Sequence, residues 1–338
     1  MTFLLQDMAM FGSKRPVSLV LWGLPISCAA ASLAYGGEPN HLRTRLAWQI
    51  ALDRIGFSPG LIDGKIGPKT ELATREFQRV RALPLTGRLD APTIAALEID
   101  PDGSVTHYTV PADDLAQIGI VPQDWEGKSR QARLAYESLS AVVAERFHCT
   151  RSLLGDLNPG VMLDSLRPGD VMIVPNVRPA AEAVRGESVE IDLRAKLIRV
   201  LDRQKRLIGL FHCSVAAEKA HLPSGETRVA VITENPTYLF DPKMWPEVKG
   251  VDRKLLIPPG PRNPVGLCWI GLGLAGYGIH GTPNPELIGK TGSHGCVRLT
   301  NWDALRLSKM IAVGTRVCFV AKCTTPVLPF HTITSPNK

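Results

Sequence analysis

The sequence predicts a multidomain α+β protein with a small three-helix domain near the N-terminus, a small α/β module in the middle and a β-rich, sandwich-like C-terminal domain. Three observations support this. The chain has 338 residues, more than one hydrophobic core usually serves. Apolar residues recur at helical spacing from 41 to 97, and strand-like runs follow one another at hairpin distances after residue 188. Two turn-rich stretches, 99–104 and 176–188, have the composition of linkers.

The composition limits the class of protein. With 44% hydrophobic and 21% charged residues, the chain can bury a core, which excludes wholesale disorder. The formal net charge of +7 suits association with an anionic envelope polymer. The basic residues are scattered, however, and no Lys/Arg block interleaved with aromatic residues indicates a nucleic-acid partner. No Gly-rich phosphate loop is present either, and we expect no cofactor.

The first 34 residues resemble a secretory signal peptide. Lys14 and Arg15 precede an apolar run, 17–34, that ends in small residues, and we expect cleavage after Ala34. An uncleaved membrane anchor is the alternative, because the run is only marginally long enough to span a bilayer. A lipoprotein site at Cys28 is not adopted, since Pro25 stands where such a site has Leu.

The region 41–98 predicts three helices separated by tight turns. The first, 42–55, places Leu42, Leu46 and Ile50 on one face; the second covers 71–80 and the third ends at 97. The stretch 62–70, Ile-Asp-Gly-Lys-Ile-Gly-Pro-Lys-Thr, together with Phe-Gln and Leu-Thr-Gly further on, resembles the small three-helix peptidoglycan-binding domain. The alternative is a helical packing domain without a ligand, because the matched residues are mainly turn formers and core.

The region 105–177 predicts the order strand, helix, helix, strand, with strands at 106–110 and 171–175 and helices at 139–147 and 150–157. This order, with Asn-Pro and Pro-Gly-Asp turns, resembles a LysM-type glycan-binding module. A long insert, 111–135, occupies a place where that module is normally compact. A spacing or docking role is therefore the alternative to sugar binding.

The C-terminal region predicts strands and one helix. Strands are expected at 189–193, 197–201, 207–215, 269–272 and 315–320, and turns at 223–227 and in the Pro-rich stretch 257–264. The helix covers 301–311 and is capped by Thr300 or Asn301.

A loop-like stretch between residues 277 and 303 carries the chemistry. It contains His280 and then Ser-His-Gly-Cys-Val-Arg at 293–298, without helical or alternating periodicity. A thiol is nucleophilic as its thiolate, so Cys296 would need a positive or basic neighbour such as His280 or His294. Gly295 leaves room for a carbonyl near the backbone amides, and Arg298 offers a fork suited to a carboxylate.

Two alternatives compete with a nucleophilic cysteine. Cys296 could be an ordinary buried thiol among loop histidines. The other chemical reading is a zinc site built from His280, His294 and Cys296, which would need a fourth ligand or an open water position. No CxxC or HExxH accompanies these residues, so we expect no metal.

His-Gly-Thr followed by Ser-His-Gly-Cys-Val-Arg-Leu-Thr-Asn resembles the motif of the L,D-transpeptidase catalytic domain of the YkuD type, found in bacterial cell-wall enzymes. The likeness extends upstream through the Pro-rich stretch 259–266 and covers about 186–322. The resemblance implies that Cys296 forms an acyl-enzyme with a tetrapeptide stem of peptidoglycan and that His280 is the base. It also implies that His294 tunes the site or shapes the loop.

Four further residues are expected to contact the substrate. Arg298 would hold a stem carboxylate, the amides of Gly295 and Cys296 would form an oxyanion hole, and Ser293 and Tyr277 would line the site. An acceptor amine would then resolve the thioester. We also expect carbapenem-type β-lactams to acylate Cys296 as a consequence of the family.

The resemblance leaves the acceptor open. Water would make the enzyme an L,D-carboxypeptidase, and the amine of an envelope protein would make it an enzyme that attaches that protein to the wall. A rival of another class is a non-catalytic wall-binding protein whose N-terminal modules do the work. The expected partners are stem peptides and glycan, and the expected location is the periplasm.

The remaining cysteines do not predict a disulfide framework. Cys149, Cys213, Cys268, Cys318 and Cys323 are an odd five without regular spacing. Most have apolar neighbours, which favours buried thiols.

Overall fold

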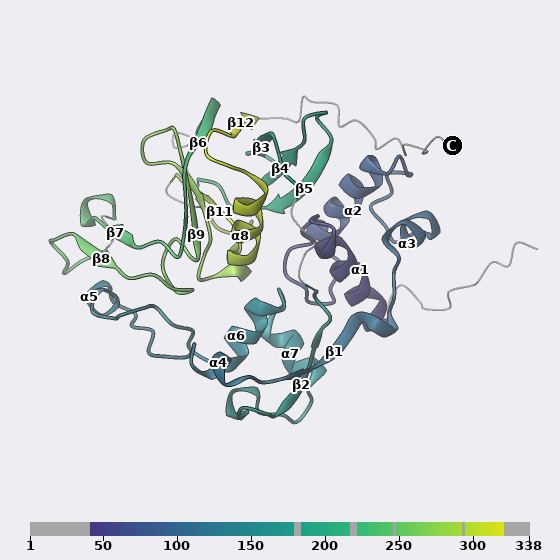
Figure 1. Ribbon diagram of the computed structural model, residues 1–338, viewed down its shortest axis with the longest axis horizontal. Helices are drawn as coiled ribbons and strands as arrows, with labels where there is room; N and C mark the ends of the chain where they lie inside the picture. Colours follow the sequence, from purple (N-terminus) through teal and green to yellow (C-terminus); the bar gives the residue numbers. More distant parts are fainter. Residues whose placement is uncertain (1–40, 179–183, 217–221, 246–247, 293–294, 321–338) are drawn as a thin grey trace, which may run out of the picture. The chain divides into compact units, whose positions relative to one another are not determined.

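The computed structural model describes residues 41–178, 184–216, 222–245, 248–292 and 295–320 (Figure 1). The expected signal peptide at 1–34, the predicted site residues Ser293 and His294, and Cys323 lie outside the described residues. Within the described ranges, no helix combines the length and apolar character needed to cross a membrane.

The N-terminal segment, residues 41–98, contains the three expected helices: α1 Leu42–Arg54, α2 Pro68–Val80 and α3 Ala91–Leu97. Helix α2 begins three residues before its predicted start, because Pro68 occupies the first turn, where a missing N–H costs nothing. The buried indole of Trp48 on α1 donates to Thr74 Oγ1 on α2 at 3.0 Å. Gln49 fastens the turn before α2 by accepting from the Gly64 amide at 2.8 Å.

The middle segment, residues 105–177, has the predicted order of strand, two helices and strand. Strands β1 Val105–Thr109 and β2 Val171–Pro175 pair antiparallel. Helices α6 Leu139–Arg146 and α7 Arg151–Leu157 lie between them in sequence and share a core with both strands. Single turns of 3₁₀ helix, η1 Asp102–Ser104 and η2 Leu163–Ser165, flank β1 and β2. The likeness to a LysM module remains a prediction.

The insert in the middle segment folds into two short helices, α4 Ala112–Leu115 and α5 Trp125–Ser129. Helix α5 packs on a two-stranded hairpin of the C-terminal segment, β7 Tyr238–Phe240 and β8 Leu255–Ile257. The Trp125 ring stacks on Phe240 with centroids 4.0 Å apart, and Arg253 pairs with Glu126 at 3.0 Å. The 111–135 insert therefore docks on the C-terminal segment.

The C-terminal segment, residues 186–320, is built on eight strands in the order β11-β10-β9-β6-β12-β3-β4-β5. Their bounds are β3 Ser188–Asp192, β4 Leu197–Leu201, β5 Leu207–His212, β6 Gly225–Glu234, β9 Cys268–Leu272, β10 Gly278–His280, β11 Val297–Arg298 and β12 Arg316–Val320. The described residues of this segment also form two short 3₁₀ turns, η4 Pro242–Met244 and η5 Pro285–Leu287, and one helix, α8 Asn301–Met310. Thr300 caps α8, as expected, by accepting from the Asp303 amide at 3.2 Å.

The long strand β6 bends the sheet. Its first part pairs with β12 and its second part with β9, with a register shift between Val229 and Val231. The prediction of a turn at 223–227 was wrong in part, because β6 already begins at Gly225. Both halves of the sheet and α8 contribute to one core, in which Ile198, Ile270 and Leu307 are all fully buried. The sheet thus curls around a shared apolar interior, as a sandwich-like domain does.

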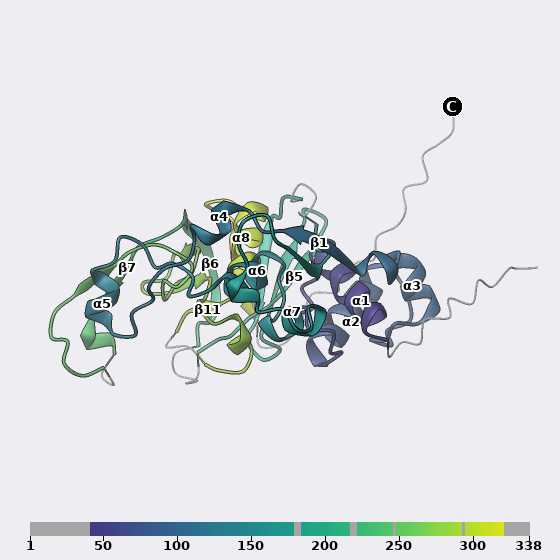
Figure 2. The same cartoon turned by 90° about the horizontal axis from the view of Figure 1, so that it is seen from below.

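The three segments belong to one compact unit, residues 37–338. Helices α1 and α2 share an apolar cluster with leucines of β4 and β5. Polar contacts join the N-terminal segment to both of the others: Ser58 Oγ donates to Asp303 Oδ2 on α8 at 2.9 Å, and Asp53 Oδ2 lies 3.1 Å from His148 Nδ1 of the middle segment. Figures 1 and 2 show α8 beside the strands of the C-terminal sheet, in line with its contacts to β9 and β10.

Candidate active site

The pairing of β10 with β11 brings the predicted histidine, cysteine and arginine together. The two strands are parallel, with Ile279 opposite Val297 and His280 opposite Arg298. Side chains alternate along a strand, and Ile279 and Val297 point into the core. His280 and Arg298 therefore emerge on the other face, and Cys296, one residue before Val297, belongs to that face too.

The Cys296 thiol is held by the turn before β10. Its Sγ lies 3.5 Å from the Gly276 carbonyl oxygen, to which the S–H donates. Burial raises the pKa of Cys296, while a hydrogen bond with the Gly278 backbone and the charge of Arg298 lower it. The sequence argument expects a lowered pKa; the structure raises it instead, because desolvation outweighs the two favourable interactions. The resting residue is a thiol, yet it is only partly buried and stays accessible.

His280 is fixed in one orientation by its backbone neighbour and by an aromatic ring. Its Nδ1 lies 2.7 Å from the Gly281 carbonyl oxygen, and since a carbonyl only accepts, Nδ1 carries the proton. The Trp269 ring on β9 stacks on the imidazole at 5.7 Å. Burial lowers the pKa of His280 to about 4. At neutral pH the ring is uncharged, and Nε2 holds a lone pair.

Arg298 ties the strand to the loop that precedes Cys296. Its Nη2 donates to the carbonyl oxygen and the hydroxyl of Thr291, each at 3.1 Å, and to the Gly292 carbonyl. Its backbone exchanges two hydrogen bonds with Ser214, at 2.9 and 2.8 Å. The guanidinium was expected to bind substrate, but its Nη2 group already donates hydrogen bonds to the protein's own loop.

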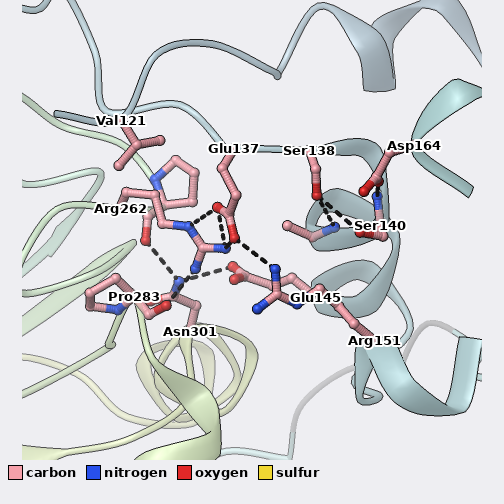
Figure 3. Close-up of polar contacts among 12 residues, drawn as sticks. Val121, Glu137, Ser138, Ser140, Glu145, Arg151, Asp164, Arg262, Pro283 and Asn301 are labelled. Atoms are coloured by element: carbon pink, nitrogen blue, oxygen red, sulfur yellow. Dashed lines mark hydrogen bonds and ion pairs between the residues drawn. The ribbon is translucent and has the colours of Figure 1, made fainter. Parts of the chain in front are cut away.

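Asn301, at the start of α8, connects the site to the middle segment. Its Oδ1 accepts from the Leu267 amide at 3.0 Å, and its Nδ2 donates to Glu145 Oε1 at 2.9 Å. Figure 3 shows this contact beside a second bridge, in which Arg262 lies between Glu137 and the Pro283 carbonyl. Arg262 comes from the Pro-rich stretch and Glu137 precedes α6, so the two bridges hold the site's loops against α6 and the residues just before it.

Residues 186–318 match the L,D-transpeptidase catalytic domain (YkuD), and residues 45–97 match the peptidoglycan binding domain family. A YkuD protein of Bacillus licheniformis, assigned as an L,D-transpeptidase, is 31% identical over 54% of this chain and 92% of its own length. This chain belongs to the L,D-transpeptidase family.

Other proteins are similar to parts of this chain. The protein YqjB of Bacillus subtilis, also assigned as an L,D-transpeptidase, is 33% identical over 44% of this chain and 71% of its own. The solved catalytic domain of the E. faecium L,D-transpeptidase is 20% identical, with a TM-score of 0.30, over 40% of this chain and 98% of its own.

The candidate site brings together residues that the sequence argument singled out and residues that it missed. Tyr277 lies beside Gly295, because its ring is 3.7 Å from the position of a Cβ on that glycine. Trp269 and Asn301 were not predicted as site residues. Trp269 lies eleven residues before His280, and no motif in the sequence around it indicates a site residue. The antiparallel pairing of β9 with β10 brings it beside His280. Asn301 was predicted as a helix cap and as the last residue of the motif, and not as a contact to the middle segment.

The described residues provide no metal centre. Among them, no group of three or more His, Cys, Asp or Glu side chains is placed to hold a metal ion. His294, the third member of the zinc alternative, lies outside those residues. The chemistry that can be built from the described atoms is that of a thiol, a neutral imidazole and a guanidinium.

Proposed function

We propose that this L,D-transpeptidase uses Cys296 to transfer a peptidoglycan stem peptide to an amine. The Cys296 sulfur attacks the carbonyl carbon between the L-centre of a diamino acid and the terminal D-residue of a tetrapeptide. The C–N bond breaks, the D-amino acid leaves with a proton, and a thioester remains. The acceptor amine then attacks the thioester and restores the thiol. The observation that carries the proposal is the accessible Cys296 thiol on the same face as His280 and Arg298.

His280 is the proposed base. Because Nδ1–H donates to Gly281, Nε2 is the nitrogen left with a lone pair to take the thiol proton. A pKa near 4 keeps that nitrogen unprotonated at neutral pH. The protonated ring can return the proton to the leaving amine. Base and thiol therefore begin as a neutral pair, and charge develops only as the reaction proceeds.

The remaining roles carry over from the family motif. The amides of Gly295 and Cys296 form the proposed oxyanion hole, where loss of one donor typically costs about 3 kcal/mol of transition-state stabilisation. Arg298 combines loop fixation with attraction for a stem carboxylate. Tyr277, beside Gly295, is placed to line the substrate path, and Ser293 and His294 belong to the same motif.

The biological setting extends the proposal. An N-terminal signal peptide, residues 1–34, would export the enzyme to the periplasm, and the N-terminal segment would hold it on peptidoglycan. The middle segment would add a LysM-like glycan contact. The E. faecium relative is described as acylated by ertapenem, and we expect carbapenems to acylate Cys296 here.

Mass spectrometry of purified 35–338 incubated with disaccharide-tetrapeptide tests the proposal, with Cys296→Ala as the control. Dimers that lack one terminal D-residue, and that are absent with the control, are the expected products. Tripeptide monomers alone would indicate an L,D-carboxypeptidase or an envelope protein as the missing acceptor. No product at all would favour a non-catalytic wall-binding protein.

A further inference from the structure

The loop that leads into Cys296, residues 285–292, is held by two lysines from different segments. Lys69 Nζ, on helix α2 of the N-terminal segment, donates to the Ile288 carbonyl oxygen at 2.7 Å. Lys196 Nζ, between β3 and β4 of the C-terminal sheet, donates to the next carbonyl, that of Gly289, at 2.9 Å. We call residues 285–292 the anchored loop.

The far end of the anchored loop is fixed by the active site itself. Thr291 and Gly292 accept from Arg298, whose backbone is paired with Ser214. Ser214 Oγ also accepts from the Gly289 amide at 2.8 Å. A displacement of the loop near residue 288 is therefore transmitted to the acceptors of Arg298, the side chain whose charge acts on the Cys296 thiol.

The Lys69 contact is specific rather than a surface encounter. Burial, and then repulsion from Lys290, lower the pKa of Lys69. The ammonium group is therefore partly shielded from water where it contacts the loop. A Cβ atom on Gly60 would lie 2.9 Å from Lys69 Cδ, which is too close. The absence of a side chain at Gly60 therefore leaves room for the Lys69 side chain. The Lys69 carbonyl is in turn bound by His212 of β5 at 3.1 Å, which fixes the base of the side chain.

We propose that Lys69 is a positioning residue for the nucleophile, so that the peptidoglycan-binding segment completes the active site as well as holding the enzyme on its polymer. The inference rests on the proposed function only in taking Cys296 as the nucleophile. Lys69 acts through the Ile288 carbonyl, the anchored loop and Arg298. A pocket of about 310 Å³ lies beside the contact between Lys69 and the anchored loop, and its lining includes Lys69 and Lys290. A ligand bound in this pocket would contact both Lys69 and the anchored loop.

The test replaces Lys69 by Met in the full mature chain, with Lys69→Arg alongside it. Removing the ammonium leaves the Ile288 carbonyl without its donor, and misplacement by about 1 Å can cost on the order of 100-fold in rate. We expect turnover to fall roughly 10- to 100-fold in Lys69→Met with little change in KM, and to recover in part in Lys69→Arg. Binding to insoluble peptidoglycan should not change.

A second readout does not depend on turnover. Iodoacetamide alkylation of Cys296, followed by peptide mapping across a pH series, reports the ionisation of the thiol. If Arg298 shifts with the loop, the pKa of Cys296 rises, and the alkylation midpoint moves to higher pH. Alkylation at neutral pH slows by about 10-fold for each pH unit of that shift.

Two further variants provide the controls. Lys196→Met removes the neighbouring anchor and should move the alkylation midpoint in the same direction. Lys309→Met removes an exposed lysine at the end of α8 and should leave the midpoint and turnover unchanged. An unshifted midpoint in Lys69→Met, with a thermal melt like that of the parent, would overturn the inference. If the parent enzyme shows no turnover, the proposed function fails, while the alkylation series still decides the role of Lys69.

Discussion

Two places in the C-terminal sheet each bring together a histidine, a cysteine and a basic side chain. The first set is His280, Cys296 and Arg298; the second is His212, Cys213 and Lys69. In both sets, burial lowers the pKa of the histidine, to about 4 in the first and about 3 in the second. In both sets the histidine donates to a backbone carbonyl. By residue type alone the two are equivalent.

They differ in which atoms remain available. His212 uses Nε2 to bind the Lys69 carbonyl, whereas His280 uses Nδ1 and keeps Nε2 for the reaction. Cys213 is fully buried and burial raises its pKa strongly, whereas Cys296 is partly exposed. The comparison teaches that composition does not make a site; access to the sulfur and the choice of ring nitrogen do.

The largest expected difference between the two sets lies in the thiols. Cys296→Ala should reduce transpeptidation to the uncatalysed background, because the variant lacks the sulfur that forms the thioester. Cys213→Ala should keep its activity and lose about 1 kcal/mol of stability, since it only empties a small buried volume. Product analysis and urea unfolding of both variants check this. Equal loss of activity in both would mean that the two sets are not distinct.

The next difference concerns the histidines. His280→Gln should lower turnover by on the order of 100- to 10,000-fold, the usual contribution of a general base. His212→Gln keeps a donor for the Lys69 carbonyl and should leave the chemical step within about threefold of the parent. Single-turnover acylation followed by mass spectrometry measures both. A large effect of His212→Gln would show that this histidine takes part in the chemistry.

A smaller effect is expected from the basic residue of the first set. Arg298→Lys preserves the charge near Cys296 but cannot reproduce the contacts of Nη2 with Thr291 and Gly292, so turnover should fall roughly tenfold. The pKa of Cys296 should change less than it does in Lys69→Met, because a cation remains close. The pH dependence of alkylation distinguishes the two outcomes. A larger shift of the Cys296 pKa in Arg298→Lys than in Lys69→Met would mean that the geometry of the guanidinium contacts matters more than the charge.

The smallest difference is in the response of stability to pH. Both histidines have a lowered pKa in the folded state, so the unfolded chain binds protons first as the pH falls below about 6.5, and stability is lost toward pH 4. For His280 the full loss is roughly 3 kcal/mol. Asp303, whose pKa burial raises to about 6, acts in the opposite direction and offsets part of this. Urea unfolding should show that the free energy of unfolding falls between pH 7 and pH 4, and that it falls less in His212→Gln. The same pH dependence in His212→Gln and in the parent would contradict a buried, neutral His212.

Much of the architecture was predictable because the apolar pattern within single helices and strands indicates them. Helix α1 and strands β4 and β12 lie within two residues of their predicted bounds, since their apolar periodicity covers the whole element. Strand β6, Gly225–Glu234, was not predicted at all, and its first residues were assigned to a turn because Gly225 follows a Pro-Ser pair that favours one. Strands β10 and β11 are three and two residues long, too short to show any period.

The sequence by itself determined the family, the segment order and the residues of the motif, because the residues between His280 and Asn301 lie close together in the chain and resemble the family's motif. Only the tertiary structure decided that burial raises the pKa of Cys296, that Arg298 holds the anchored loop, and that Lys69, 219 residues before Ile288, reaches it. The physical reason is that desolvation and side-chain reach depend on which distant segments pack together. Local propensity and periodicity carry no record of that.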